Sequence, residues 1–373
     1  MAKPLQKPSI DEVDILNQNA DVDDSKELSK QNETTGNMLN GLPLDIIALV
    51  SRHLHLFDYL SFRTTCKSYR STLPLSLFRR RTYDVSLPLF VFLKSKEGLF
   101  QVMDPIRNDS VSIAIPKPPK GAFCIQYCKD GWLVLYSGGQ TLHFFNLFTR
   151  KRGDFPPNEY TRYFKSVGFS TYSGSSDCVT VGIYGHKAAT IWYFVFRDQT
   201  WESAEFDSGQ EEFFPSTCPP VYHNGGFYFL DRKGSLGVFK LVGRKATWHV
   251  YGRPQIKQMQ FLSFYLVECD GRLFCVIMEK LGIQIKVFRF DDQKKDWVRV
   301  KSLGNHTFFI SRSSSISTVA RELGSGNRIY FPRLHDNRFI FYSLETRKYH
   351  GLGTEFSMEN FCPSKEPLDC SWA

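Results

Sequence analysis

Hydrophobic and polar positions divide the chain into four stretches. Residues 1–38 are polar and acidic with isolated apolar side chains, and they cannot bury enough surface to offset the entropy of ordering. We therefore expect a disordered acidic tail there. Residues 39–83 show apolar positions at helical spacing, residues 84–362 show the alternation of β-strands, and residues 363–373 are expected to form a C-terminal tail. The pattern predicts a small all-α module followed by a large all-β domain.

The helical pattern begins at Pro43, a residue type that suits the first turn of a helix. Apolar residues then recur at positions i, i+1, i+4 and i+8, which we assign to one helical face: Ile46, Ile47, Val50 and Leu54. A second helical segment with Leu60 among its apolar residues comes next. A module of about 40 residues has little core of its own, so we expect it to need a partner surface.

Six strand-like cores recur along the β-domain at intervals of 42, 49, 45, 49 and 54 residues. Their equivalent positions are Met103, Phe145, Phe194, Phe239, Phe288 and Tyr342. An apolar or aromatic residue comes after each core: Ile113, Phe155, Trp201, Trp248, Trp297 and Tyr349. Most cores are preceded by a strand that opens on Gly or Asn, and glycine supplies positive φ at a tight turn without steric cost.

Intervals of this size with several strands per unit are typical of a β-propeller. Closing the units into a ring also removes exposed sheet edges. The six units predict six blades, with seven as the alternative if residues 304–323 add strands of their own. A stack of hairpins in a sandwich is the other architecture that this pattern leaves open.

The formal net charge of +9 is unevenly distributed along the chain. Residues 1–40 contain four lysines and eight acidic residues, a net charge of −4 that leaves +13 for the remainder. A basic body can attract nucleic acid or an acidic partner. The basic residues are scattered, however, and the longest basic run is Arg79–Arg81, so nucleic acid is not the partner we expect.

Cysteine usage and hydropathy indicate the compartment. Nine cysteines without regular spacing argue against a disulfide framework and for a reducing environment. No apolar run reaches the roughly 18 residues needed to span a membrane. The N-terminal stretch lacks an apolar signal core. We expect the protein in the nucleus, the cytoplasm or both, without a membrane partner.

The sequence contains no nucleophile elbow, phosphate loop or metal-protease motif. Cys124 and Cys128 in "CIQYC" have no matching Cys/His pair nearby, and on a regular strand they would share one face. We interpret them as buried small hydrophobes. We therefore expect no catalytic residues, no metal ligands and no cofactor, although an enzyme whose residues converge from separate blades stays open.

The segment "NEYTRYFKS" (158–166) places aromatic side chains beside basic ones between two repeats. Exposed aromatic and arginine residues are typical of interfaces. The segment is therefore a candidate substrate-facing loop, formed by Tyr160, Arg162, Tyr163 and Phe164. The plainer interpretation, which we favour, is a loop that packs on its own blade.

The segments "LPLDIIALVSRHL" and "DYLSFRTTCKSYRS" resemble the F-box, a helical module that docks onto adaptor proteins of the Skp1 type. The family usually has Trp where this chain has Tyr69, which is a conservative departure. The resemblance implies that the adaptor is bound by Leu42, Pro43, Ile46, Ile47, Val50, Leu54 and Leu60.

Two further segments, "SLGNHTFFISRSSSISTVARELGSGNRIYFPR" and "FIFYSLETRKYHGLG", resemble plant F-box proteins with a Kelch-related C-terminal domain of unknown function. Together the resemblances imply a non-catalytic substrate-recognition subunit of an SCF-type (Skp1–cullin–F-box) E3 ubiquitin ligase. Such a subunit binds the adaptor, and through it a cullin, and holds a protein target on its β-domain. The alternatives are a non-ligase F-box scaffold and a propeller-type ligand-binding protein or enzyme.

Overall fold

The computed structural model divides the chain into two compact units, one of Met1–Ser86 with Asp109–Ile113 and one of Leu87–Asn108 with Ala114–Ala373. We call the helices of residues 43–73 the helical unit and the strands from Phe90 onward the β unit, in which Ser110–Ala114 is included because it belongs to a four-stranded sheet. The structure describes residues 43–54, 56–73, 88–95, 98–105, 109–116, 123–138, 141–171, 175–185, 189–206, 212–255, 262–279, 284–320, 325–335, 338–351, 357–358 and 370–373. The predicted disordered tail at 1–38 lies outside these residues.

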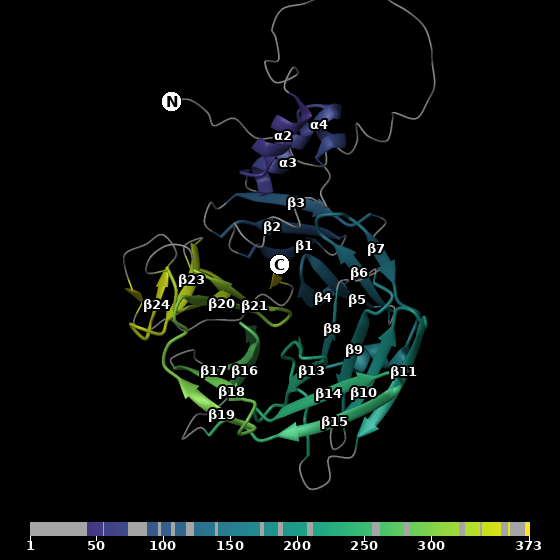
Figure 1. The fold of residues 1–373 in the computed structure, drawn as a ribbon, viewed down its shortest axis with the longest axis vertical. Coiled ribbons are helices and arrows are strands. Elements are labelled where there is room, and N and C mark those ends of the chain that lie inside the picture. The colour runs from purple at the N-terminus through teal and green to yellow at the C-terminus, as the bar shows by residue number, and fades with distance from the viewer. Residues whose placement is uncertain are drawn as a thin grey trace, which may run out of the picture. The chain divides into compact units, whose positions relative to one another are not determined.

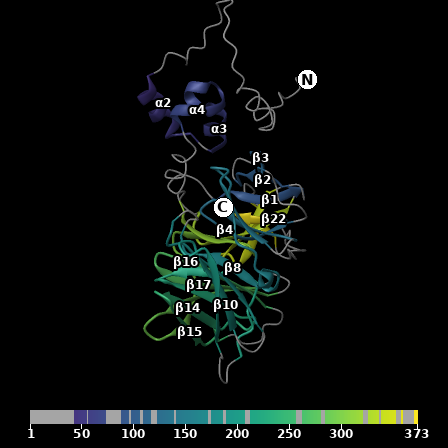
Figure 2. The same cartoon turned by 90° about the vertical axis from the view of Figure 1, so that its right-hand side faces the viewer.

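The helical unit contains α2 (Leu44–Ser51), α3 (Leu56–Thr64) and α4 (Lys67–Thr72), which are labelled in Figure 2. Pro43 occupies the position before α2 with extended backbone (ψ 146°), and Asp45 places a carboxylate in the first turn, where the helix dipole favours negative charge. Four apolar side chains of this unit are almost fully buried: Ile47, Tyr59, Tyr69 and Leu73.

Tyr69 stands where the F-box family usually has Trp, and it fills a core position. Its side chain is 3% exposed, and its ring centroid lies 4.9 Å from that of Phe62. Its backbone N–H donates to Cys66 Sγ, which caps the start of α4. The smaller aromatic ring therefore still joins α3 to α4.

The β unit consists of six sheets arranged around a common centre (Figure 1), which confirms the predicted six-bladed propeller. Blade 1 contains β26 (Cys370–Trp372), β1 (Phe90–Ser95), β2 (Leu99–Met103) and β3 (Ser110–Ala114). Blade 2 contains β4 (Phe123–Lys129), β5 (Trp132–Ser137), β6 (Thr141–Asn146) and β7 (Arg152–Asp154). Blade 3 contains β8 (Ser166–Phe169), β9 (Val179–Tyr184), β10 (Ala189–Val195) and β11 (Thr200–Phe206).

The remaining three sheets come next in chain order. Blade 4 contains β12 (Val221–His223), β13 (Gly226–Leu230), β14 (Leu236–Val242) and β15 (Lys245–Tyr251). Blade 5 contains β16 (Leu262–Cys269), β17 (Arg272–Glu279), β18 (Ile285–Asp291) and β19 (Asp296–Val300). Blade 6 contains β20 (His306–Ile310), β21 (Ser315–Val319), β22 (Arg328–His335), β23 (Arg338–Ser343), β24 (Lys348–Gly351) and β25 (Ser357–Met358).

The repeat found in the sequence corresponds to one structural position per blade. The predicted cores fall on β2, β6, β10, β14, β18 and β23, and the aromatic or apolar residues after them lie on, or directly after, the next strand outward. Trp201 and Trp297 show why an aromatic recurs there. Each indole N–H donates at 3.0 Å to a carbonyl 45 residues earlier, Pro156 and Gly252 respectively, just after the last strand of the preceding blade.

Tight turns connect the strands where the sequence places Gly after Asp or Asn. Asp130, Asn224 and Asp270 have φ of 55°, 45° and 50°, and the glycine directly after each also has positive φ. Asp and Asn tolerate this left-handed region better than other side chains, and glycine adopts it without strain. This is the two-residue turn expected of twisted antiparallel hairpins.

Residues 304–323 add strands to blade 6 and do not form a seventh blade. β20 pairs antiparallel with β21 on one side and parallel with β22 on the other, and the resulting sheet has six strands. The chain leaves β21 and returns to the opposite side of β20, which makes the parallel pair. The described part of the chain thus contains six sheets in this unit.

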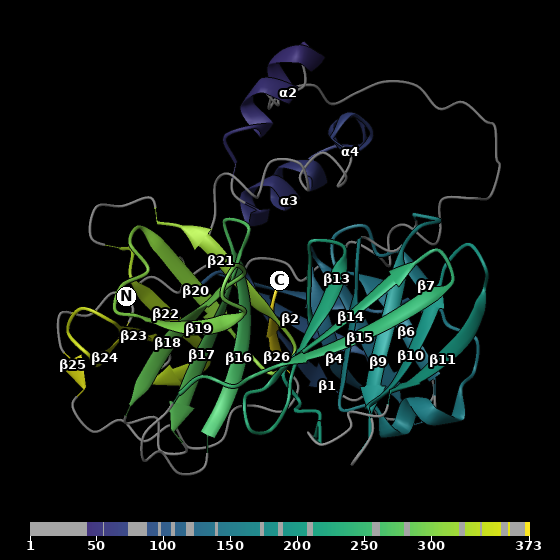
Figure 3. The ribbon, with the colours of Figure 1, turned by 60° about the horizontal axis from the view of Figure 1, so that its bottom comes forward.

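The last residues complete the ring, whereas the sequence pattern predicted a tail at 363–373. β26 pairs with β1 in the register Phe90↔Trp372, and Leu89 and Ala373 exchange two backbone hydrogen bonds of 2.9 Å. Figures 1 and 3 show the C terminus near the middle of the ring. The first blade is therefore built from both ends of the β unit, which is a common way to close a propeller.

Candidate functional site

Helix α2 presents apolar side chains on two sides. Ile47 is 1% exposed and belongs to the core of the helical unit, together with the hydroxyl of Ser51, which donates to the Ala48 carbonyl. Ile46, Leu49 and Val50 remain 39%, 50% and 41% exposed. These three residues are spaced i, i+3 and i+4, so they form one continuous stripe, which we call the α2 stripe.

The structure separates the residues that the F-box resemblance assigns to adaptor binding. Ile46 and Val50 lie on the α2 stripe, and Pro43 is exposed at the start of the helix. Leu54 and Leu60 are half-buried. Ile47 faces the core, so its side chain is not available on the stripe, and Leu42 lies outside the described residues.

Two exposed apolar residues of α2 were not among the predicted docking residues. Leu49 completes the α2 stripe, and Leu44, at 55% exposure, is the most exposed of the four large apolar residues that this helix leaves exposed. The i+3 spacing from Ile46 to Leu49 is a signal that helical periodicity alone contains. An apolar helix face of this kind is a recognised mode of docking into a partner's groove.

The predicted substrate-facing loop forms a short 3₁₀ helix, η2 (Glu159–Tyr163), capped by the Asn158 side chain, which accepts from the Tyr160 N–H. The Tyr160 ring stacks on Trp192 of blade 3 with centroids 4.8 Å apart. Phe164 packs so closely on the same blade that a Cβ on Gly182 would lie 2.3 Å from its ring. The favoured interpretation, packing on its own blade, therefore describes these two residues.

Arg162 and Tyr163 behave differently from their neighbours on η2. Tyr163 is 47% exposed, and the Arg162 guanidinium lies 4.7 Å from the centre of its ring. A cation over an aromatic ring at an exposed site is a weak attraction, of the order of 0.5–1 kcal/mol. This pair is the part of the predicted loop that faces solvent.

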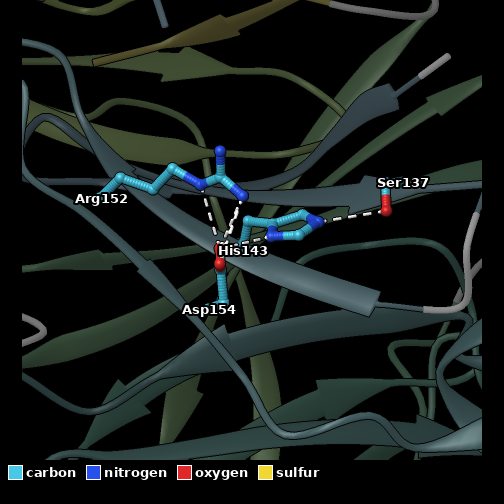
Figure 4. A network of polar contacts seen from close by, with 4 residues as sticks. All are labelled: Ser137, His143, Arg152 and Asp154. Atoms are coloured by element: carbon cyan, nitrogen blue, oxygen red, sulfur yellow. Dashed lines mark hydrogen bonds and ion pairs between the residues drawn. The ribbon is translucent and has the colours of Figure 1, made fainter. Parts of the chain in front are cut away.

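A serine, a histidine and an aspartate form a chain of hydrogen bonds in blade 2 (Figure 4). His143 Nδ1 lies 2.7 Å from Asp154 Oδ1, and His143 Nε2 lies 3.1 Å from Ser137 Oγ. Arg152 also donates to the Asp154 carboxylate, from Nε at 3.0 Å. This order of groups matches the catalytic triad of serine hydrolases.

The exposure of these three residues is the reverse of what a working catalytic triad requires. The Ser137 and His143 residues are 3% and 6% exposed, whereas the Asp154 side chain is 55% exposed. A nucleophilic serine has to meet its substrate, and here that hydroxyl is enclosed. Burial acts to raise the pKa of the Asp154 carboxyl, but hydrogen bonds from His143 and Arg152 outweigh it and lower that pKa. The arrangement fits a structural link between β6 and β7.

The cysteines of the β unit are mostly enclosed. Burial raises the pKa of the Cys128 and Cys218 thiols to about 12, so both stay protonated near neutral pH. Cys124 and Cys128 do not share a face as predicted, because β4 contains a bulge between Ile125 and Tyr127. The bulge adds one residue and reverses the orientation of the strand residues after it.

The chain combines a helical unit that has an exposed apolar helix face with a β unit that forms a six-bladed ring. The KIB1-4 beta-propeller model matches residues 99–353 and the F-box domain model matches residues 39–80, and the chain belongs to this family of F-box substrate receptors. Among curated relatives, F-box/kelch-repeat protein At1g57790 of Arabidopsis thaliana is 28% identical over 86% of this chain and 90% of its own length. F-box protein At3g56470 of the same plant is 27% identical over 76% of each chain.

In the described part of the chain, none of the helices is long and apolar enough to cross a bilayer.

Proposed function

We propose that this protein is the substrate-recognition subunit of an SCF-type E3 ubiquitin ligase. In this role the α2 stripe binds a Skp1-type adaptor, the adaptor connects to a cullin, and the propeller holds the protein to be ubiquitylated. The observation that carries the proposal is the exposed apolar stripe of Ile46, Leu49 and Val50 on a helix whose other side is already buried in its own module.

Energetics support docking through this stripe. Fully burying a Leu, Ile or Val side chain contributes about 1.5–3 kcal/mol, and these three side chains keep two-fifths to one-half of their surface exposed. A groove that covers them gains a corresponding fraction of that free energy from each. Pro43 and Leu44 are also exposed at the start of α2, and they extend the apolar surface available to the adaptor.

The propeller suits target binding because it is a rigid ring with exposed connecting loops. We assign the Arg162–Tyr163 pair as the target-facing part of η2, since Tyr160 and Phe164 are held against blade 3. No transfer chemistry is assigned to this chain. Its contribution is to hold the target near a ubiquitin-loaded enzyme, where tethering raises the effective concentration to the millimolar range.

Reconstitution with purified partners tests the proposal. The full chain is co-expressed with a plant Skp1-type adaptor, the complex is mixed with a cullin, and assembly is monitored by size-exclusion chromatography. A ternary complex supports the ligase role. A stable adaptor complex that excludes the cullin supports a non-ligase scaffold instead. The proposed nuclear or cytoplasmic location is tested by imaging a fluorescent fusion of the full chain.

A further inference from the structure

Three potential metal ligands meet where blade 5 adjoins blade 6. Cys269 ends β16, Asp270 lies in the next turn, and His306 begins β20. Their ligand atoms, one thiol, one carboxylate oxygen and one imidazole nitrogen, all lie within 4.8 Å of one another. The chain separates His306 from the other two residues, so only the stacking of the two blades brings them together. Figures 1 and 3 show β16 and β21 side by side at this seam.

The imidazole of His306 is oriented so that one nitrogen faces the cluster. Nδ1 lies 3.2 Å from the Leu303 carbonyl, which can only accept, so Nδ1 carries a hydrogen. Nε2 is buried and makes no well-aligned hydrogen bond within the described residues, although Asp270 Oδ2 lies 2.9 Å away. A backbone carbonyl on one ring nitrogen is the usual means of directing the other nitrogen at a metal.

The backbone that carries Asp270 forms a tight turn. Asp270 and the adjacent Gly271 have φ of 50° and 69°, and the Gly271 N–H donates to Glu268 Oε1 at 2.7 Å. The Ser317 hydroxyl of β21 donates to the Glu268 carbonyl at 2.7 Å, which joins blade 6 to blade 5 at the same level. The three ligand-bearing residues are therefore set on two strand ends and a tight turn, and not on a long loop.

We propose that Cys269, Asp270 and His306 bind a divalent zinc-class cation that links blade 5 to blade 6. A thiolate, an imidazole and a carboxylate together favour Zn²⁺ over Mg²⁺ or Ca²⁺, which prefer oxygen ligands alone. Three protein ligands leave one position of a tetrahedral ion for water. One thiolate and one carboxylate balance the two positive charges of the ion, which keeps the half-buried site neutral.

Binding of the ion replaces a proton on sulfur. Burial raises the pKa of the Cys269 thiol to about 11, and the nearby carboxylates of Asp270 and Glu268 add to this. The thiol is therefore protonated without metal, and it releases that proton to solvent when the sulfur–metal bond forms. No oxidant or reductant is involved in the step.

The test uses the full chain, freed of metal with a chelator under reducing conditions, and titrated with Zn²⁺ and with Co²⁺ as a coloured substitute. We expect one ion per chain and a thiolate-to-cobalt charge-transfer band. Cys269→Ser should abolish that band. Asp270→Asn and His306→Ala should weaken Zn²⁺ binding by more than the roughly 10- to 100-fold that accompanies loss of a metal site's supporting partners.

Two matched variants control for other cysteines and histidines. Cys66→Ser alters a half-buried thiol in the helical unit, and His249→Ala alters an exposed histidine of blade 4. Both should bind Zn²⁺ like the parent chain. Asp270 carries a 69% exposed side chain, so Asp270→Asn can be tested in a folded protein even if the buried Cys269 variant does not fold. Absence of saturable binding, or equal binding by the parent and Asp270→Asn, overturns the proposal.

Discussion

The backbone N–H of Trp372 donates a 2.9 Å hydrogen bond to the Ser314 hydroxyl, which joins two residues that are 58 positions apart. Ser314 belongs to the buried turn between β20 and β21, and Trp372 is the last residue of β26. Ser313 of the same turn donates to the Cys370 carbonyl at 2.9 Å. The serines of blade 6 thus hold the strand that closes blade 1.

Replacing Ser314 tests this closure. Ser314→Ala leaves the buried Trp372 N–H without its acceptor, which costs about 1–3 kcal/mol of the free energy of unfolding. At roughly 2–4 °C per kcal/mol, we expect a melting temperature lower by several degrees. The control is Ser203→Ala, at an exposed position of β11. Equal melting temperatures for the two variants would show that the serine contact does not hold the ring closed.

Two strand glycines test how η2 packs on blade 3. In Gly182→Ala the new Cβ would lie 2.3 Å from the ring of Phe164, whereas at Gly153 nothing lies within 4 Å. Overpacking typically costs about 1–3 kcal/mol, so Gly182→Ala should lower the denaturant midpoint. Gly153→Ala should be neutral or slightly stabilising, because alanine restricts the unfolded chain. Adding Phe164→Leu to Gly182→Ala should restore part of the loss, and no difference between the glycine variants would refute the packing.

The polar link of blade 2 makes stability depend on pH. The folded-state pKa of Asp154 is lowered by His143 and Arg152, so the link stabilises the protein fully above the ordinary carboxyl pKa of about 3.9. This contribution is lost as the pH falls through the lowered folded-state pKa. We expect Asp154→Asn to be less stable than the parent chain at pH 6–7, roughly two to three pH units above that ordinary value.

Urea unfolding at several pH values measures this difference. It should shrink as the solution is acidified below about pH 4, where the parent carboxylate also becomes protonated. The Asp154 side chain is largely exposed, so water and salt screen its ion pairs and limit the size of the stability difference. A stability difference that stays constant from neutral to acidic pH would rule out the carboxylate as its source.

The repeat was predictable from the sequence because each blade places an apolar residue, aromatic in all but the first blade, at the same structural position. Trp201 and Trp297 show this most directly, since the same hydrogen bond recurs at the same separation. The closing strand was not predictable. Its three residues, Cys370–Trp372, are too few to show alternation, and their partner β1 begins 280 residues earlier in the chain.

Helix α2 shows a second limit of sequence patterns. Periodicity identified α2, but Ile46 and Ile47 are adjacent and equally apolar, so only the packing of the unit shows that Ile47 faces inward. The metal-ligand cluster shows a third limit. Cys269 and Asp270 lie one blade before His306, and no spacing rule for metal motifs relates residues whose proximity depends on blade stacking.

Adaptor binding by the α2 stripe is the central claim, and a binding titration tests it most directly. The affinity of a purified plant Skp1-type adaptor is measured for the parent chain, for Leu49→Glu, and for Ser68→Glu. Ser68 is an exposed residue in the first turn of α4, where an added carboxylate is tolerated. The two variants therefore add the same charge at positions on and off the stripe.

We predict that Leu49→Glu weakens adaptor binding at least about tenfold. The variant loses the burial of the exposed half of the leucine, about 0.8–1.5 kcal/mol, and it also places a carboxylate without a partner in the covered groove. Ser68→Glu should bind like the parent chain. Equal affinity of the parent chain and Leu49→Glu for the adaptor would contradict the claim that the α2 stripe is the docking surface.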